Sequence, residues 1–213
     1  AKRLHDDGFD AYELNFAANN VGQSFLSRAR NNREDEYGPQ SFENRARIYT
    51  ETQEMIREAV PADFLVGLRI GVNLPDLDNA MGVVKAIAAA GPDYFHFSKH
   101  ILSAPRREEL PEDFPCAQTV FDGTLLRKVV DVPVMVSFNI SRPEQARYLL
   151  EHDMADLVTV GRGMLADYDW TRKAREGEAV DECFHCPACQ WRIDYKLCPA
   201  VRQRLDKGES WPQ

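Results

Sequence analysis

The sequence alternates short apolar segments with longer segments of helical pattern, and this alternation narrows the possible folds more than any other feature. Five segments have the pattern of strands, at residues 10–16, 64–70, 94–97, 134–137 and 156–160. Each is apolar on both faces or nearly so, as expected of strands covered by helices. Strands that alternate with helices form a parallel sheet with crossover connections. We therefore expect an α/β fold built from five βα units.

Helix-start signals fall between these strands. Ser41 is expected to begin a helix that has Glu43 in its first turn, and Asp78 is expected to begin another. Ser141 and Glu144 have the spacing of a capping box and predict the start of a third helix. These signals place a helix after the first, second and fourth strands.

The length of the chain limits how these units can close. The 213 residues, of which 44% are hydrophobic, suffice for one sizeable core but not for two ordinary domains. A closed (β/α)8 barrel needs three more units and typically about 250 residues. We expect an incomplete TIM barrel over residues 1–178 and a cysteine-rich segment over residues 179–213. The chain is then a fragment of a longer enzyme, or pairs with a chain that supplies the missing strands, or is a degenerate barrel with another task.

Charge and hydropathy exclude several classes of partner. The formal net charge is −8, whereas nucleic-acid binding depends on clustered Lys and Arg. The longest weakly polar stretch, residues 81–90, is interrupted by Lys85 and is about half of what a bilayer crossing needs. No apolar signal segment stands out. We expect a cytoplasmic protein without a membrane or nucleic-acid partner.

Four of the five cysteines lie close together near the C-terminus. Cys183, Cys186 and Cys189 are spaced as Cys-x2-Cys-x2-Cys, and Cys198 follows with Pro199 directly after it. Three closely spaced thiolates and a distant fourth beside a proline are typical of ligands to a [4Fe–4S] cluster. The run therefore predicts an iron–sulfur cluster.

Two other kinds of site compete with the cluster. Structural zinc is the first, although zinc sites more often use two separated Cys-x2-Cys pairs. A mixed Cys/His site is the second, because His185 lies inside the run. Disulfides fit less well, since Cys116 stands alone and the core is larger than a small stapled domain needs.

Seven further segments carry a family resemblance. Together with the cysteine run they resemble the Old Yellow Enzyme superfamily, in particular the branch that includes 2,4-dienoyl-CoA reductase and trimethylamine dehydrogenase. The resemblance implies an FMN- and [4Fe–4S]-dependent oxidoreductase, similar to an ene-reductase or an amine dehydrogenase, that acts on a small organic substrate. It also implies NAD(P)H or FAD bound through domains outside this chain. The segments are GFDAYEL (8–14), FLS (25–27), NNREDEYG (31–38), SFENRARI (41–48), VGLRIGV (66–72), VPVMVSFNISRPEQA (132–146) and DLVTVGRGMLAD (156–167).

Five residues are candidates for the FMN site. Gly161 and Arg162 follow the last strand, where glycine lets N–H groups approach an anion and arginine supplies a forked charge. The resemblance implies that they bind the FMN phosphate. Phe138 and Asn139 stand where relatives place a glycine that reaches the same phosphate. Arg69 lies in an apolar strand and needs an acceptor, which the resemblance identifies as the flavin pyrimidine edge. The alternatives are a glycine turn with a surface arginine, and a structural ion pair for Arg69.

The expected catalytic positions depart from the family. Asn15, Ala18 and Asn20 stand where reductases carry a His-x-x-His or His-x-x-Asn pair and a proton-donating tyrosine. Asn15 can still donate a hydrogen bond to a substrate, but Ala18 cannot, and Asn20 is no general acid. His100, after the third strand, is the second catalytic candidate, whereas we interpret His96 as a packed or outward-facing residue.

A second hypothesis belongs to a different class of protein. The chain is then a non-enzymatic partial barrel that is stabilised by zinc or an iron–sulfur site and binds a partner subunit. An absorption spectrum separates the two hypotheses, because flavin and cluster bands belong to the enzyme alone.

Overall fold

The computed structural model describes residues 1–18, 20–72, 76–99 and 109–211. Within these ranges five strands form one parallel sheet in chain order. Each strand begins and ends within one residue of the predicted segment, so the βα alternation predicted the sheet correctly. The strands are β1 (Ala11–Phe16), β2 (Leu65–Gly71), β3 (Tyr94–Ser98), β4 (Val134–Ser137) and β5 (Leu157–Thr159).

The strands pair in one continuous register. Asn15 pairs with Arg69, Arg69 with His96, His96 with Met135, and Met135 with Leu157. This row crosses all five strands, and side chains that are paired in register point to the same face of a sheet. Residues far apart in the sequence therefore come together on one face.

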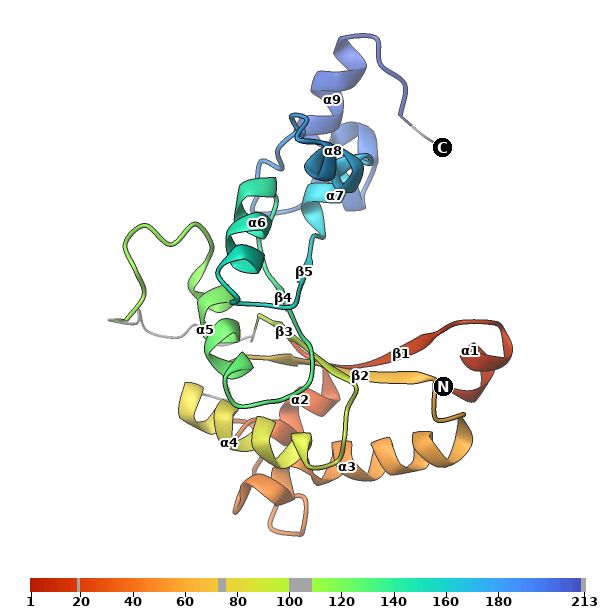
Figure 1. The fold of residues 1–213 in the computed structure, drawn as a ribbon, viewed down its shortest axis with the longest axis vertical. Helices are drawn as coiled ribbons and strands as arrows, with labels where there is room; N and C mark the ends of the chain where they lie inside the picture. The colour runs from red at the N-terminus through yellow and green to blue at the C-terminus, as the bar shows by residue number, and fades with distance from the viewer. Residues whose placement is uncertain (19, 73–75, 100–108, 212–213) are drawn as a thin grey trace.

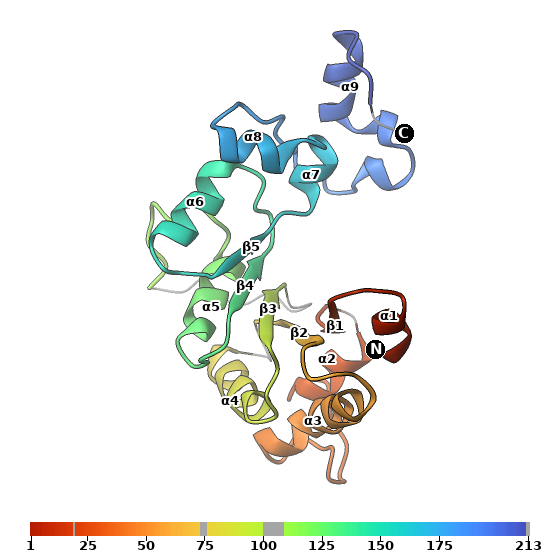
Figure 2. The same cartoon turned by 45° about the vertical axis from the view of Figure 1, so that its right-hand side comes forward.

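Helices cover the other face of the curved sheet (Figure 1). In particular, α3 packs against α4, and α5 packs against β3 and β4. The view in Figure 2 shows that the cysteine-rich segment and α9 lie beyond β5 at one end of the molecule. The helices are α1 (Lys2–Asp6), α2 (Val21–Leu26), α3 (Phe42–Ala59), α4 (Leu77–Ala88), α5 (Gln118–Arg127), α6 (Pro143–Glu151), α7 (Arg162–Ala166), α8 (Trp170–Glu176) and α9 (Pro199–Asp206), with 3₁₀ turns η1 (Gln190–Arg192) and η2 (Tyr195–Leu197).

The two faces of the sheet differ in chemistry. On the helix-covered face Leu68, Ile70, Phe95, Phe97 and Val136 are fully or almost fully buried, and each such side chain contributes roughly 1.5–3 kcal/mol. The inner face carries many polar side chains beside apolar ones such as Met135, so the expectation of strands that are apolar on both faces is wrong for this side. Its polar residues include Glu13, Asn15, Arg69, His96, Ser98, Ser137 and Thr159.

The helix starts agree only in part with the sequence signals. Ser41 caps α3 as predicted, and its hydroxyl accepts a hydrogen bond from the Asn44 N–H at 3.0 Å. The cap of α4 is Asp76, which accepts from the Asn79 N–H at 2.8 Å, and the predicted Asp78 lies in the first turn.

The predicted Ser141–Glu144 capping box is wrong. Pro143 is the first residue of α6, which makes Arg142 the N-cap and agrees with the preference of proline for that position. The side chain of Gln145 then reaches back and accepts from the N–H groups of Ser141 and Arg142, at 3.0 and 3.1 Å.

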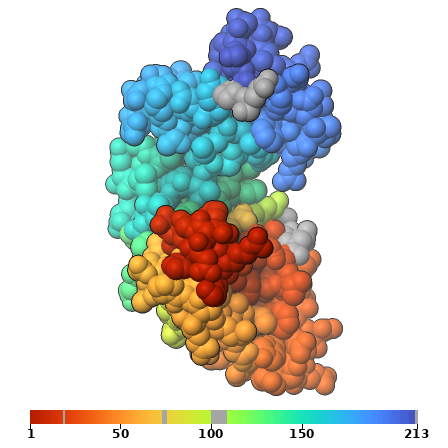
Figure 3. All heavy atoms as spheres, turned by 90° about the vertical axis from the view of Figure 1, so that its right-hand side faces the viewer, coloured from red at the N-terminus to blue at the C-terminus, as the bar shows by residue number. Residues whose placement is uncertain are grey.

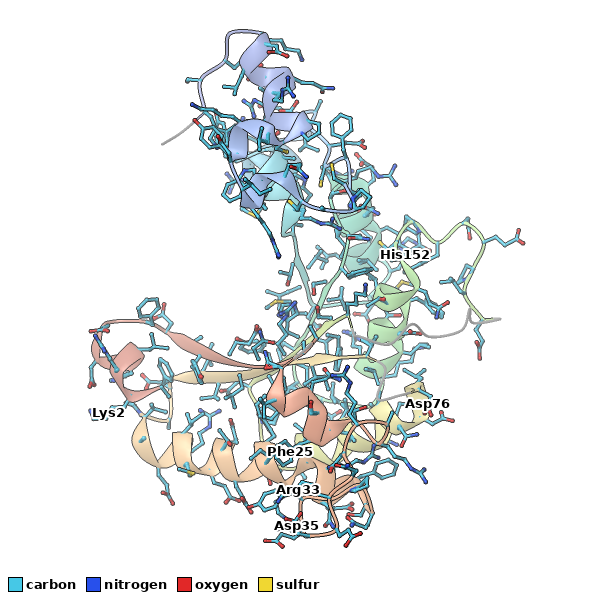
Figure 4. The ribbon with its side chains drawn as sticks, turned by 180° about the vertical axis from the view of Figure 1, so that it is seen from behind. Lys2, Phe25, Arg33, Asp35, Asp76 and His152 are labelled. Carbon is cyan, nitrogen blue, oxygen red and sulfur yellow. The ribbon has the colours of Figure 1, made fainter. Side chains whose placement is uncertain are left out.

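The loop that precedes α3 is held by polar and aromatic contacts (Figure 4). The Arg33 guanidinium lies over the rings of Phe25 and Tyr37, at 5.5 and 5.7 Å from their centroids, and pairs with Asp35. The Asn31 amide donates to the carbonyl groups of Phe25 and Tyr37 at 3.0 and 2.6 Å. These contacts support a structural role for the arginine-rich loop.

The molecule is elongated, and Figure 3 shows the C-terminal helices (blue) at the end opposite α3 (orange). Five parallel strands in chain order, joined by helices on one face, are the arrangement of part of a (β/α)8 barrel. Within the described chain β1 and β5 form the two edges of this open sheet. No helix in the described ranges is both long and apolar enough to cross a membrane.

Candidate cofactor site

A cavity of about 790 Å³ lies on the inner face, between the carboxyl ends of β2 to β5 and the cysteine-rich segment. Arg69, Arg162 and Arg192 line it, together with His96 and His185. None of the described lining residues is an aspartate or a glutamate, although the whole chain has a net charge of −8. The cavity therefore favours an anionic ligand.

Arg69 reaches the cavity from β2. Its Nη2 donates to the Ser98 hydroxyl at 2.8 Å, and its Nε is buried without a partner among the described residues. The predicted alternative, a structural ion pair, is not present among the described side chains. A buried donor without a partner lowers the stability of the folded state by about 1–3 kcal/mol. A ligand that accepts a hydrogen bond from the Arg69 Nε would remove this cost.

The turn after β4 has an unusual backbone. Phe138 has a φ of +127° and Asn139 a φ of +55°. Asparagine tolerates the left-handed region, whereas the value at Phe138 belongs to a region adopted almost only by glycine. This conformation gives a physical reason for the glycine that the family resemblance implies at this position. In this chain phenylalanine adopts it.

Gly161 and Arg162 form the turn after β5 and face the turn after β4. The Arg162 guanidinium donates to the side-chain oxygen of Asn139 and so joins the two turns. A methyl group added to Gly161 would meet nothing within 4 Å, so its backbone is open to the cavity. The predicted residues Phe138, Asn139, Gly161 and Arg162 thus line one wall.

These groups fit a ligand that carries a phosphate and several hydrogen-bond acceptors. The Arg69 Nε and the Thr159 hydroxyl are both buried without a partner. Arg162 and the open side of Gly161 add a forked charge and accessible backbone in the same cavity. This donor set matches what FMN requires at its ring edge and at its phosphate.

The cysteine-rich segment forms the opposite wall of the cavity. His185 in this segment places its Nε2 3.0 Å from the Ser141 hydroxyl. Burial, followed by the nearby charge of Arg162, lowers the pKa of His185 below its usual value. Sequence reasoning did not identify His185 or Arg192 as cavity residues, because the fold of the segment was not predictable from the spacing of its cysteines.

The structure does not gather the four cysteines into a ligand set. Cys183, Cys186, Cys189 and Cys198 are all free thiols of intermediate exposure, and of these Cys186 and Cys189 line the cavity. No group of three or more His, Cys, Asp or Glu side chains suited to a metal ion occurs in the described ranges. A [4Fe–4S] cluster needs four thiolates around one centre. The arrangement does not fit a loaded cluster, which stays a prediction from the spacing.

Of the two catalytic candidates, Asn15 does not join this wall. Asn15 lies on β1, and its side-chain oxygen accepts from the Ala17 N–H at 3.2 Å. It thereby stabilises the turn after the strand, and it does not line the cavity. His100 lies outside the described residues.

A hydrogen-bonded chain below the cavity was not predicted. His96 on β3 is buried, with its Nδ1 3.0 Å from a Glu13 carboxylate oxygen and its Nε2 2.9 Å from the Ser137 hydroxyl. The expectation of a packed residue holds for His96, but the side chain faces inward and lines the cavity. These contacts join β1, β3 and β4. The sequence signal that could have indicated them was the placement of polar residues at alternate positions along the strands.

Comparison with known proteins gives the family. The model of the NADH:flavin oxidoreductase / NADH oxidase family matches residues 1–181. The NADH oxidase of Thermoanaerobacter brockii is 32% identical over 185 residues, which cover 84% of this chain and 28% of that enzyme. The chain therefore spans less than a third of the length of this relative.

Solved structures show the same fold. Morphinone reductase in complex with tetrahydroNAD is 25% identical with a TM-score of 0.66, over 86% of this chain and 48% of that chain. The old yellow enzyme homologue from Zymomonas mobilis is 19% identical with a TM-score of 0.68, over 92% of this chain and 56% of that chain. The chain belongs to the NADH:flavin oxidoreductase / NADH oxidase family of the Old Yellow Enzyme superfamily, and its five βα units form part of a TIM barrel.

Proposed function

We propose that this chain is part of a flavin-dependent oxidoreductase and binds FMN in the cavity at the carboxyl ends of β2 to β5. One observation carries the proposal: three arginines and no described carboxylate line the cavity in a chain of net charge −8. Such a pocket favours the phosphate of FMN and the negative charge of a reduced flavin ring.

The two neighbouring turns would hold the phosphate. Arg162 exchanges its neutral acceptor, the Asn139 side chain, for phosphate oxygens, which form stronger charge-assisted bonds. The backbone at Gly161 and at Phe138 and Asn139 supplies further N–H donors. The residues that hold the phosphate thus come from the ends of β4 and β5.

Arg69 would hold the other end of the flavin. Its unpartnered Nε and the Thr159 hydroxyl are available for the polar edge of the ring. FMN bound here supplies hydride and single-electron transfer. The fixed positive charge of Arg69 favours the reduced, anionic ring.

The reaction class follows from the family, and the substrate is a small organic molecule. The name of the NADH oxidase relative supports NADH as the source of electrons. The oxygen of Asn15 is engaged by Ala17, so its part in the reaction would be donation from its amide nitrogen to a substrate oxygen. His100 remains a proposed acid on the basis of the sequence.

The proposed enzyme includes two further parts. Residues 1–178 would contribute five of the eight barrel units, and a partner chain or a preceding region would contribute the others. Residues 179–213 would bind the [4Fe–4S] cluster through Cys183, Cys186, Cys189 and Cys198. The spacing supports the cluster, and zinc is its alternative. Iron, sulfide and zinc analysis of anaerobically purified protein decides between them.

Titration of the full chain with FMN tests the proposed function. Quenching of flavin fluorescence gives the dissociation constant, and Arg162→Ala is expected to weaken binding roughly 10- to 100-fold because a charge-assisted contact is lost. Arg175→Ala is the matched control, since that guanidinium is 79% exposed and lies outside the cavity. Equal affinities for both variants and the natural chain would contradict FMN binding at this site.

The non-enzymatic partial barrel is the second candidate function. The exposed inner-face residues Leu65 and Leu157, at 45% and 47%, favour it because they leave apolar surface open to a partner subunit. A colourless protein that contains one zinc and does not bind FMN would support this function and contradict the oxidoreductase.

A further inference from the structure

His185 connects two parts of the chain that are far apart in the sequence. It belongs to the cysteine-rich segment, yet its Nε2 lies 3.0 Å from the hydroxyl of Ser141, which precedes α6. Its backbone has a φ of +50°, a conformation that is uncommon outside glycine, although His is one of the residues enriched there. The imidazole is thus turned toward the barrel and lines the cavity.

Ser141 fixes where this imidazole lies. Its N–H donates to the Gln145 side chain at 3.0 Å, and its carbonyl accepts from the Trp170 indole at 2.7 Å. Its Cα lies 3.1 Å from the position that a methyl group on Gly163 would occupy. Ser141 is therefore held against the turn that contains Gly161 and Arg162, and it holds His185 beside that turn.

We propose that His185 is a phosphate ligand of the bound flavin nucleotide, contributed by the cysteine-rich segment. This inference rests on the proposed function, and it adds a residue outside the segments that suggested the phosphate site. Nε2 can exchange the Ser141 hydroxyl for a phosphate oxygen, just as Arg162 can exchange Asn139. Both present partners are neutral, and a bond to a charged acceptor is the stronger one.

The proposal predicts that His185 distinguishes a flavin with a phosphate from one without. Riboflavin has the same ring as FMN but no phosphate, so His185 would contribute to the binding of FMN alone. Loss of one hydrogen bond to a charged group weakens binding roughly 10- to 100-fold. The cysteine-rich segment would then close the nucleotide site directly, and its position would determine how well the phosphate is retained.

The experiment measures the affinities of FMN and riboflavin for the full chain by fluorescence quenching. The variants are His185→Ala, which removes the donor, and His185→Gln, which keeps an N–H donor at a similar distance from the backbone without the imidazole ring. His152→Ala is the control, because His152 is exposed at the end of α6 and does not line the cavity (Figure 4). Circular dichroism melting curves verify that each variant is folded.

The expected result is a natural chain that prefers FMN to riboflavin. His185→Ala loses roughly 10- to 100-fold in affinity for FMN and little for riboflavin, His185→Gln recovers part of the loss, and His152→Ala changes neither. An equal loss for both ligands would show that His185 only anchors the segment and would overturn the inference. An unchanged preference in His185→Ala would overturn it too. A natural chain without preference for FMN would overturn both this inference and the proposed phosphate site.

Discussion

At the scale of single residues, Phe138 carries the clearest backbone strain in the site. Its φ of +127° lies in a region that costs a residue other than glycine about 1–3 kcal/mol. The side chain itself is partly buried against the main core, and the Lys99 ammonium lies 5.3 Å from its ring centroid. Strain and packing therefore oppose each other at this position.

Comparison of Phe138→Gly with Phe138→Ala separates these two effects. Both variants lose the ring, but only glycine relieves the backbone. We expect the glycine variant to be the more stable by about 1–3 kcal/mol, measured as the free energy of unfolding in urea. The same pair at Phe9, which is 57% exposed and has no positive φ, should show the opposite order by roughly 0.5–1 kcal/mol. If the alanine variant were the more stable one at both positions, backbone strain at Phe138 would be contradicted.

Cys116 gives a prediction about pH. Burial raises the pKa of this thiol from 9.0 to about 11, so at pH 8 only about one molecule in a thousand carries the thiolate. Alkylation by iodoacetamide should be slow at pH 8 and should accelerate about tenfold per pH unit toward pH 11, as followed by peptide mass spectrometry. Because the pKa of Cys116 is raised in the folded state, the buried neutral thiol makes its full contribution to folding stability below pH 9. This contribution is lost as the pH rises toward 11. Labelling at pH 8 as fast as that of free glutathione would contradict this burial.

At the scale of elements, Asp167 joins the last barrel helices to the cysteine-rich segment. Its side chain is fully buried, with the Lys173 ammonium at 2.6 Å, the Arg204 guanidinium at 3.2 Å and the Asp181 N–H at 3.0 Å. Burial acts to raise the pKa of Asp167, but the hydrogen bonds from Lys173 and from backbone N–H groups outweigh it and leave the pKa lowered. One carboxylate thus ties together α8, the start of the segment and α9.

Asp167→Asn should loosen this connection. Removal of one partner from a buried ion pair lowers the free energy of unfolding by about 3–5 kcal/mol. Because α9 is then held less firmly, its amide hydrogen exchange should accelerate. Asp169→Asn is the control, because Asp169 is 33% exposed and pairs with Arg172 near the surface, where such a pair contributes about 0–1 kcal/mol. Equal exchange in both variants would contradict the role of Asp167. Since the pKa of Asp167 is lowered, its contribution is present above pH 4 and is lost as the pH falls through the folded pKa.

The elements also show which information the sequence contains. The strands and the turn after the last strand were predictable because their signals are local: Gly161 and Arg162 directly follow an apolar run. The hydrogen-bonded series Glu13–His96–Ser137 was not predictable, since it links residues that lie 83 and 41 positions apart in the sequence. The buried pairing of Asp167 with Arg204 also depends on how distant helices pack. Cysteine spacing suggested a ligand set, but spacing alone does not determine how the segment folds.

At the scale of the whole molecule, the sheet is a barrel segment that stays open. Within the described chain β1 and β5 each leave one edge without a neighbouring strand. The inner face also exposes Leu65 on β2 and Leu157 on β5, at 45% and 47%. Unpaired edges beside exposed apolar side chains are sites where strands from another chain add on.

We therefore expect the isolated chain to self-associate through these edges as its concentration rises. Leu157→Lys places a charge on the inner face of the β5 edge, which opposes strand addition, and should shift sedimentation velocity profiles toward the monomer. Leu197→Lys is the matched control, because Leu197 is 44% exposed in η2, outside the sheet, and should leave association unchanged. A natural chain that stays monomeric at every concentration would contradict self-association. Equal dissociation by both variants would place the contact away from the β5 edge. Dissociation by Leu157→Lys alone would identify the β5 edge as the surface through which the chain associates.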